Sequence, residues 1–278
     1  MSVIKEKFNI SSVLPSILKQ EWKDSLQGCN TVLFDNLSHF IYTVSKITQK
    51  QDENCGISYK DALKKLSQGV SDFPQSEQDT IRNLVRENLF KRGLITEEIY
   101  EDFKYSTDGT QVGIDVGKYA SGDAECVITP SKQYIDFFYE IYVNVSYPYW
   151  VKNSAVRENV AKLLATIEEL ERQHVFIKIN VVLPVNKIKI NLSDSEVNKF
   201  FSIIPVFSYK DFKSVDVMSS VVNDRLLRKF YFAILEDLYG NNLNSTYGQA
   251  TELPKAMNIG NVFNEVEFFE TVKNNIGM

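Results

Sequence analysis

The side chain best suited to act as a nucleophile in this sequence is Cys126, which stands directly after Glu125. Cysteine reacts as the thiolate, and a thiolate forms at neutral pH when a base or a cation lies nearby. A neighbouring carboxylate has the opposite effect. The two histidines of the chain, His39 and His174, stand in no recognisable catalytic motif. We therefore interpret Cys126 as a structural cysteine and expect no catalytic residue and no enzymatic activity.

Three glycines, Gly113, Gly117 and Gly122, lie shortly before Cys126. A phosphate-binding loop needs Gly-Lys-Ser/Thr at its end, followed by the start of a helix. Neither feature follows these glycines, so turn geometry explains them. We expect an irregular segment here and no nucleotide cofactor.

Basic side chains concentrate in one predicted helix, at Arg225, Arg228 and Lys229. Such a cluster is suited to a phosphate group or to an acidic partner. The same helix carries Asp224 and Glu236, and pairing within the helix competes with an external contact. The cluster is therefore a candidate basic contact, and intramolecular salt pairing is the favoured interpretation.

A second charged group lies on another predicted helix. Its members are Glu168, Glu169, Glu171 and Arg172. Charged side chains that follow one another on a helix usually face the solvent. We expect a solvated helix face here.

The elements that must position these residues follow from the hydrophobic pattern of the second half of the chain. Residues 134–145 predict a strand, 154–172 an amphipathic helix and 175–184 a second strand. A helix of this length between two strands is typical of a crossover between parallel strands. Residues 200–207 predict a third strand and residues 216–239 a second long helix. The class is α/β, with a doubly wound sheet.

The first part of the chain has a different pattern of apolar residues. Apolar residues recur at helical spacing through most of residues 11–92, and Ser58 and Gly69 are suited to cap one short helix. We predict a helical N-terminal layer over residues 1–93, a glycine-containing connecting segment over 94–133, and an α/β domain over 134–278.

The run from Gly117 to Cys126 and the later Leu226-Leu-Arg-Lys-Phe230 resemble an uncharacterised family of tailed-bacteriophage proteins, over roughly residues 55 to 250. That family carries Gly-x-Pro-Glu-Cys and, later, a Leu-Arg-Arg step. Here Ala124 replaces the proline, and Lys229 replaces the second arginine. The resemblance implies a phage-encoded protein whose motif residues are Tyr119, Gly122, Glu125 and Cys126.

The strand–helix–strand half is also similar to a von Willebrand factor A-type domain. Such domains often bind a divalent metal through Asp-x-Ser-x-Ser at the end of the first strand. This sequence has Asn144-x-Ser146-x-Pro148 there. Because asparagine offers only a neutral oxygen and proline offers no ligand, Asn144 and Ser146 are weak metal candidates and we expect no metal. The strand end remains the expected interaction edge, formed by Asn144, Ser146, Tyr147, Tyr149 and Trp150.

Composition and charge limit the partners and the compartment. The chain has 31 basic and 36 acidic residues and a net charge of −5, which disfavours a nucleic-acid partner. No apolar run approaches the roughly 18 residues of a membrane span. The three cysteines, Cys29, Cys55 and Cys126, are widely spaced, as is typical of a reducing compartment. We expect a protein of the host cytoplasm, or of the virion, with no membrane partner.

Three functions remain open at this point. The favoured one is a protein–protein interaction or adaptor protein, with a viral or host protein as partner, that acts during phage infection or assembly. The first alternative is a structural virion component, such as a minor capsid, connector or tail-associated protein. The second is an enzyme or accessory factor of nucleic-acid metabolism, for which the residues are missing. The sequence leaves the oligomeric state open.

Overall fold

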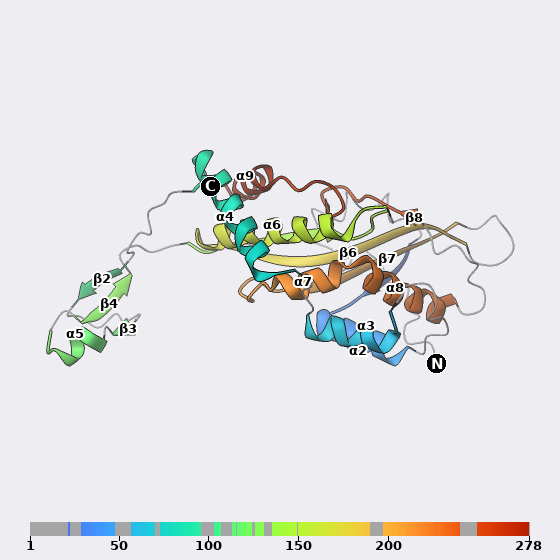
Figure 1. Ribbon diagram of the computed structural model, residues 1–278, viewed down its shortest axis with the longest axis horizontal. Helices are drawn as coiled ribbons and strands as arrows, with labels where there is room; N and C mark the ends of the chain where they lie inside the picture. Colours follow the sequence, from blue (N-terminus) through green and yellow to red (C-terminus); the bar gives the residue numbers. More distant parts are fainter. Residues whose placement is uncertain are drawn as a thin grey trace.

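Two β-sheets organise the chain in the computed structural model (Figure 1). The structure describes residues 22, 29–47, 57–69, 73–95, 103–106, 113–114, 116–123, 126–130, 135–148, 150–189, 197–239 and 249–277. The larger sheet has six strands and the smaller has three.

The larger sheet has the strand order β1-β7-β6-β5-β9, and β8 pairs with the far end of β6. Every neighbouring pair along this order is parallel except β6 with β7, and the β6–β8 pair is also antiparallel. The strands are β1 (Cys29–Leu33), β5 (Phe137–Asn144), β6 (Val175–Lys189), β7 (Val197–Phe207), β8 (Gln249–Ala250) and β9 (Met257–Asn258). The predicted α/β class is thereby confirmed, with a mostly parallel sheet.

The predicted strand–helix–strand crossover is also confirmed. Helix α6 (Asn153–Glu171) connects β5 to β6, and these strands pair in parallel from Phe137 opposite Val175 to Asn144 opposite Val182. The buried residues of α6, among them Val160 and Leu163, face the sheet because an amphipathic helix must cover the apolar face of the strands it joins.

The other helices are α2 (Leu37–Lys46), α3 (Tyr59–Gln68), α4 (Gln75–Lys91), α7 (Val215–Val222), α8 (Asp224–Tyr239) and α9 (Glu265–Ile276). All contribute to one hydrophobic core, which contains Ile141, Val143, Ile177 and Ile179 of the central strands. Alternate residues of a strand point to opposite faces, so these helices lie on one face of the sheet. A doubly wound sheet needs helices on both faces, and the described residues place none of these seven long helices, α6 included, on the second face.

Two further predictions need correction. Residues 29–33, in the region predicted to be a helical layer, form the edge strand β1, which pairs in parallel with β7. The single helix predicted for residues 216–239 is broken into α7 and α8, because Asn223 has an extended backbone (φ −63°, ψ 121°). The Asn223 side chain then accepts a hydrogen bond from the backbone N–H of Leu226, which starts α8.

The second face of the sheet carries a smaller cluster built around Trp22, which is completely buried. The Trp22 indole makes edge contacts with Tyr142 and Phe201, at ring-centroid distances of 5.1 and 5.6 Å. Its Nε1 donates a hydrogen bond to the carbonyl of Pro254, at 2.6 Å. Trp22 thus ties the chain around residues 253–254 to the sheet.

The predicted connecting segment contains a small unit of its own. It comprises β2 (Phe103–Ser106), β3 (Gly113–Ile114), α5 (Val116–Ala120) and β4 (Val127–Pro130), with β4 paired antiparallel to both other strands. Figure 1 shows this unit in green, apart from the larger sheet. The residues of the unit whose burial the structure describes, 114, 116–123, 126 and 127, belong to neither hydrophobic core cluster.

Candidate functional site

The carboxyl end of β5, the predicted interaction edge, is closed by the C-terminal part of the chain. Asn144 is fully buried, and its Nδ2 donates a hydrogen bond to the carbonyl of Thr251, at 2.8 Å. Its Oδ1 accepts from the backbone N–H of Ser146, at 2.9 Å. The hydroxyl of Ser146 accepts from the backbone N–H of Thr251, at 3.3 Å. The two weak metal candidates therefore have their side-chain oxygens engaged within the chain.

The neighbouring aromatic residue is buried as well. Tyr147 is 6% exposed, and its hydroxyl donates a hydrogen bond to the carbonyl of Val222, at 2.8 Å. Trp150 is 71% exposed, and Tyr149 lies outside the described residues. The expected contact surface at Asn144, Ser146 and Tyr147 is thus wrong, because these side chains hold the chain together. Trp150 retains the exposure that a contact needs.

The candidate basic contact also needs correction. Lys229 is 1% exposed, and its ammonium donates a hydrogen bond to the carbonyl of Ile57, before α3. The spacing of Leu226, Lys229, Phe230 and Ala233 on one buried helix stripe is the signal that could have revealed this. The side chains of Arg225 and Arg228 lie outside the described residues.

The motif residues fall in the small unit. Tyr119 of α5 is 67% exposed, and Gly122 has φ +75° in the turn that follows, a conformation that favours glycine. Cys126 is half-buried, and Glu125 lies outside the described residues. His39 pairs with Asp35, and His174 pairs with Asp136.

The face of the sheet away from the helices carries an exposed group of aromatic rings that the sequence analysis missed. We call Phe138, Phe176, Tyr209 and Lys210 the aromatic patch. Phe138 is 52% exposed. The Phe138 ring stacks on Phe176, with centroids 5.9 Å apart, and meets Tyr209 edge-on at 5.2 Å. The signal in the sequence is the alternation of β5, which puts Phe138 and Tyr142 on the face opposite Ile141.

Charged groups border the aromatic patch. The ammonium of Lys210 lies 4.8 Å from the centroid of Phe176 and pairs with Asp136 at 2.9 Å. Nδ1 of His174 lies 3.2 Å from the other oxygen of Asp136. The hydrogen bond from Lys210, followed by that from His174, lowers the pKa of Asp136. The carboxylate therefore stays ionised and holds Lys210 over the rings.

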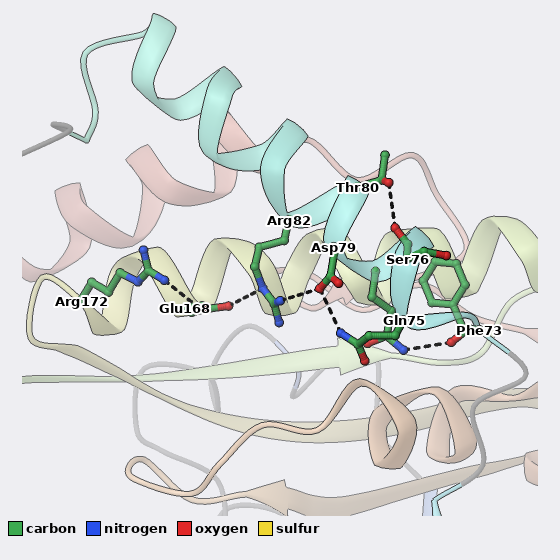
Figure 2. A network of polar contacts seen from close by, with 9 residues as sticks. Phe73, Gln75, Ser76, Asp79, Thr80, Arg82, Glu168 and Arg172 are labelled. Atoms are coloured by element: carbon green, nitrogen blue, oxygen red, sulfur yellow. Dashed lines mark hydrogen bonds and ion pairs between the residues drawn. The ribbon is translucent and has the colours of Figure 1, made fainter.

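A polar cleft of about 420 Å³ lies between α4, α6 and the start of α7, and Figure 2 shows the network along it. Arg82 of α4 donates from Nε to Glu168 at 2.9 Å and from Nη1 to Asp79 at 3.0 Å. Arg172 donates to the other oxygen of Glu168 at 3.0 Å, and Gln75 donates to Asp79 at 3.0 Å. The network joins α4 to α6.

Two further charged side chains of this region, Lys213 and Glu169, are buried. Lys213 is 5% exposed in its side chain and binds Glu171, together with the carbonyls of Tyr209 and Asp211 at 3.1 Å each. Glu169 is 6% exposed, which corrects its assignment to a solvated face. Burial raises the pKa of Glu169, and the nearby Arg172 opposes this only in part. The ion pairs of the cleft therefore connect α4, α6 and the segment before α7.

These features define an α/β protein with a mostly parallel larger sheet, in which the polar side chains at the carboxyl end of β5 are hydrogen-bonded within the chain. A family model described as "Domain of unknown function (DUF7192)" matches residues 26–276. Since the match spans most of the chain, the protein belongs to this family. No curated protein matches the chain. No solved structure matches it either.

In the part of the chain that the structure describes, no group of three or more His, Cys, Asp or Glu side chains could hold a metal ion. None of the helices described is long and apolar enough to cross a membrane.

Proposed function

We propose that this chain is a non-enzymatic protein-binding module that contacts a partner protein through the aromatic patch. The observation that carries the proposal is the exposure of Phe138, which is 52% accessible in the centre of an aromatic group on an otherwise regular strand. A large aromatic side chain in that position usually becomes buried against another surface.

The chemistry of the patch suits a protein partner. Interfaces are enriched in aromatic residues, which bury a large area with little loss of conformational freedom. Lys210 lies over two of the rings, at 4.8 Å from Phe176 and 5.8 Å from Phe138, so that the patch also presents a cation. An apolar side chain flanked by a carboxylate would complement both parts, and this is the partner chemistry that we propose.

The end of β5 supports a binding role over a catalytic or metal-dependent one. The side chains of Asn144 and Ser146 are engaged by Thr251, and Tyr147 is engaged by Val222. Side chains used to hold the fold together are not available to a substrate. We accordingly propose a von Willebrand A-like module without its metal; the parallel pair β5–β6 joined by α6 supports this assignment.

A phage origin and a role in infection or assembly remain part of the proposal. They rest on the resemblance around Tyr119, Gly122 and Cys126. The genes that neighbour this one test them, because phage genes lie beside the machinery they serve.

The binding function is tested by a photoreactive amino acid at position 138, in cells that express the protein. Phe90 of α4 is the control position, because it is also a phenylalanine and is 45% exposed. We expect a cross-linked partner at position 138 that is absent at position 90.

The purified partner must then bind the wild-type chain directly. We expect Phe138→Ser to weaken its affinity by about tenfold or more, as for a central interface residue. Phe90→Ser should leave the affinity unchanged. Equal cross-linking at both positions, or an affinity that ignores Phe138→Ser, would refute the proposed function.

A further inference from the structure

We propose that the small unit of residues 103–130 is an internal ligand of the aromatic patch, which it covers in competition with the partner protein. The competition with a partner rests on the proposed function, because the unit would cover the surface that the partner uses. The docking itself is a property of the isolated chain and does not need a partner.

The first reason is the size of the unit. Its strands have four, two and four residues, and α5 has five. Sheets this small are marginal in water, because they bury too little apolar surface to offset the entropy of ordering the chain. The unit therefore gains stability from a surface on which it can rest.

The second reason is that the unit exposes apolar side chains of its own. Ile114 is 45% exposed, Val116 is 75% exposed and Tyr119 is 67% exposed. All three belong to β3 and α5, within six residues of one another. Their burial against Phe138 would remove apolar surface on both sides from water, which is favourable at about 25 cal/mol per Å².

The third reason is the connection between the two surfaces. β4 ends at Pro130, and Phe138, the first residue of the aromatic patch, follows eight residues later. The intervening chain spans at most about 28 Å, given about 3.5 Å per residue. A short tether gives an effective concentration in the millimolar range, so that even a weak contact is well populated.

Charge does not oppose the same pairing. Residues 103–130 contain four acidic and two basic residues, and Lys118 is paired with Asp123 at 3.8 Å. In the patch, the exposed ammonium of Lys210 is paired with Asp136 at 2.9 Å, so that its charge is balanced within the larger sheet. In Figure 1 the unit stands apart from the larger sheet, so the docked arrangement is a second position of the same unit.

A photoreactive residue at position 119 tests the docking in the purified chain without any partner. Tyr42 of α2 is the matched control, because it is also a tyrosine and is 63% exposed. We expect position 119 to cross-link to peptides that contain Phe138, Phe176 or Tyr209, with a yield that does not depend on protein concentration. Position 42 should give no such product, and Phe138→Ser should reduce the yield at position 119 severalfold.

Cross-linking at position 119 that never reaches the patch would overturn the inference. Products that form only between two chains, with a yield that rises with concentration, would also overturn it, because they assign the patch to a second copy. Cross-linking to the patch in the same molecule supports it even if no partner is ever found.

The regulatory part is measured with the partner identified at position 138. The double variant Val116→Ser/Tyr119→Ser should bind that partner about threefold to tenfold more tightly, because the competing internal state is lost. An unchanged affinity would refute the competition. A chain that docks internally but binds no partner would refute the proposed function alone.

Discussion

Single side chains at the end of β5 decide whether this edge of the sheet is open to a ligand. Asn144 is fully buried, and both ends of its amide are hydrogen-bonded to the chain. A divalent cation would have to displace these bonds and would gain only neutral oxygens. The Asn-x-Ser-x-Pro sequence is therefore better explained as a structural joint than as an impaired metal site.

A magnesium titration tests this interpretation. Because the oxygens of Asn144 and Ser146 are engaged, we expect millimolar Mg²⁺ to change the melting temperature of the wild-type chain by less than about 1 °C. The measurement is a thermal-shift assay with and without the metal. A rise of several degrees in the wild type that disappears in Ser146→Ala would show that the ion does bind here.

A second residue-scale prediction concerns Glu169, whose pKa is raised by burial. The folded protein then binds more protons than the unfolded chain, so Glu169 makes stability fall as the pH rises through its folded-state pKa. Glu169→Gln removes this titration. We expect the variant to gain stability relative to the wild type between about pH 4 and pH 7.

Urea unfolding at several pH values measures this difference. Glu158→Gln is the control, because Glu158 also lies on α6 but its side chain is 53% exposed. If the free energy of unfolding of Glu169→Gln differed from that of the wild type by the same amount at every pH, the burial argument would be contradicted.

At the scale of the elements, one close approach joins the end of β5 to the segment after β9. A methyl group added at Gly260 would lie 2.6 Å from Cβ of Tyr147, a distance at which something must move. Tyr147 is fixed by its hydrogen bond to Val222, and Asn159 of α6 holds the carbonyls of Ile259 and Asn261. A shift of Tyr147 or of the backbone around residue 260 would disturb these hydrogen bonds.

We therefore expect Gly260→Ala to lower the free energy of unfolding by about 2 kcal/mol or more, in the range of overpacked cores. Denaturant unfolding measures it. Gly93→Ala is the comparison, because its methyl group meets no atom within 4 Å although its φ is +69°; that strain alone costs about 1 kcal/mol. A smaller loss of stability for Gly260→Ala than for Gly93→Ala would show that the contact between residue 260 and Tyr147 can relax.

At the scale of the whole molecule, the larger sheet and the small unit are separable in their packing. The described members of the core of the larger sheet come from residues up to Ile95 and from Phe137 onwards, and none of them lies at residues 114, 116–123, 126 or 127. Phe103 pairs with Pro130 across β2 and β4, so the two ends of the unit lie about 5 Å apart.

A linker of a few glycines should consequently replace residues 103–130 without unfolding the rest. We expect the melting temperature of this variant to stay within about 5 °C of the wild type. Circular dichroism during heating measures it. An insoluble chain, or a much lower melting temperature, would mean that the unit supports the larger sheet.

The sequence by itself determined the elements whose signals are local. Alternation and helical periodicity predicted β5, α6 and β6, because side-chain direction repeats within each element. Ser58 caps α3 by accepting from the backbone N–H of Asp61, and Gly69 ends it with φ +63°, as their residue types indicated. The net charge and the lack of a catalytic motif could likewise be stated from composition.

The tertiary structure decided what depends on partners far along the chain. β1 became an edge strand because β7, about 170 residues later, offers it a parallel ladder. Lys229 became buried because α8 packs where the carbonyl of Ile57 can accept a hydrogen bond from its ammonium. Asn144 does not lie on an open edge, because its side-chain amide donates a hydrogen bond to the carbonyl of Thr251, 107 residues later in the chain. The aromatic patch is exposed because the described helices pack on the other face, a choice that no local pattern encodes.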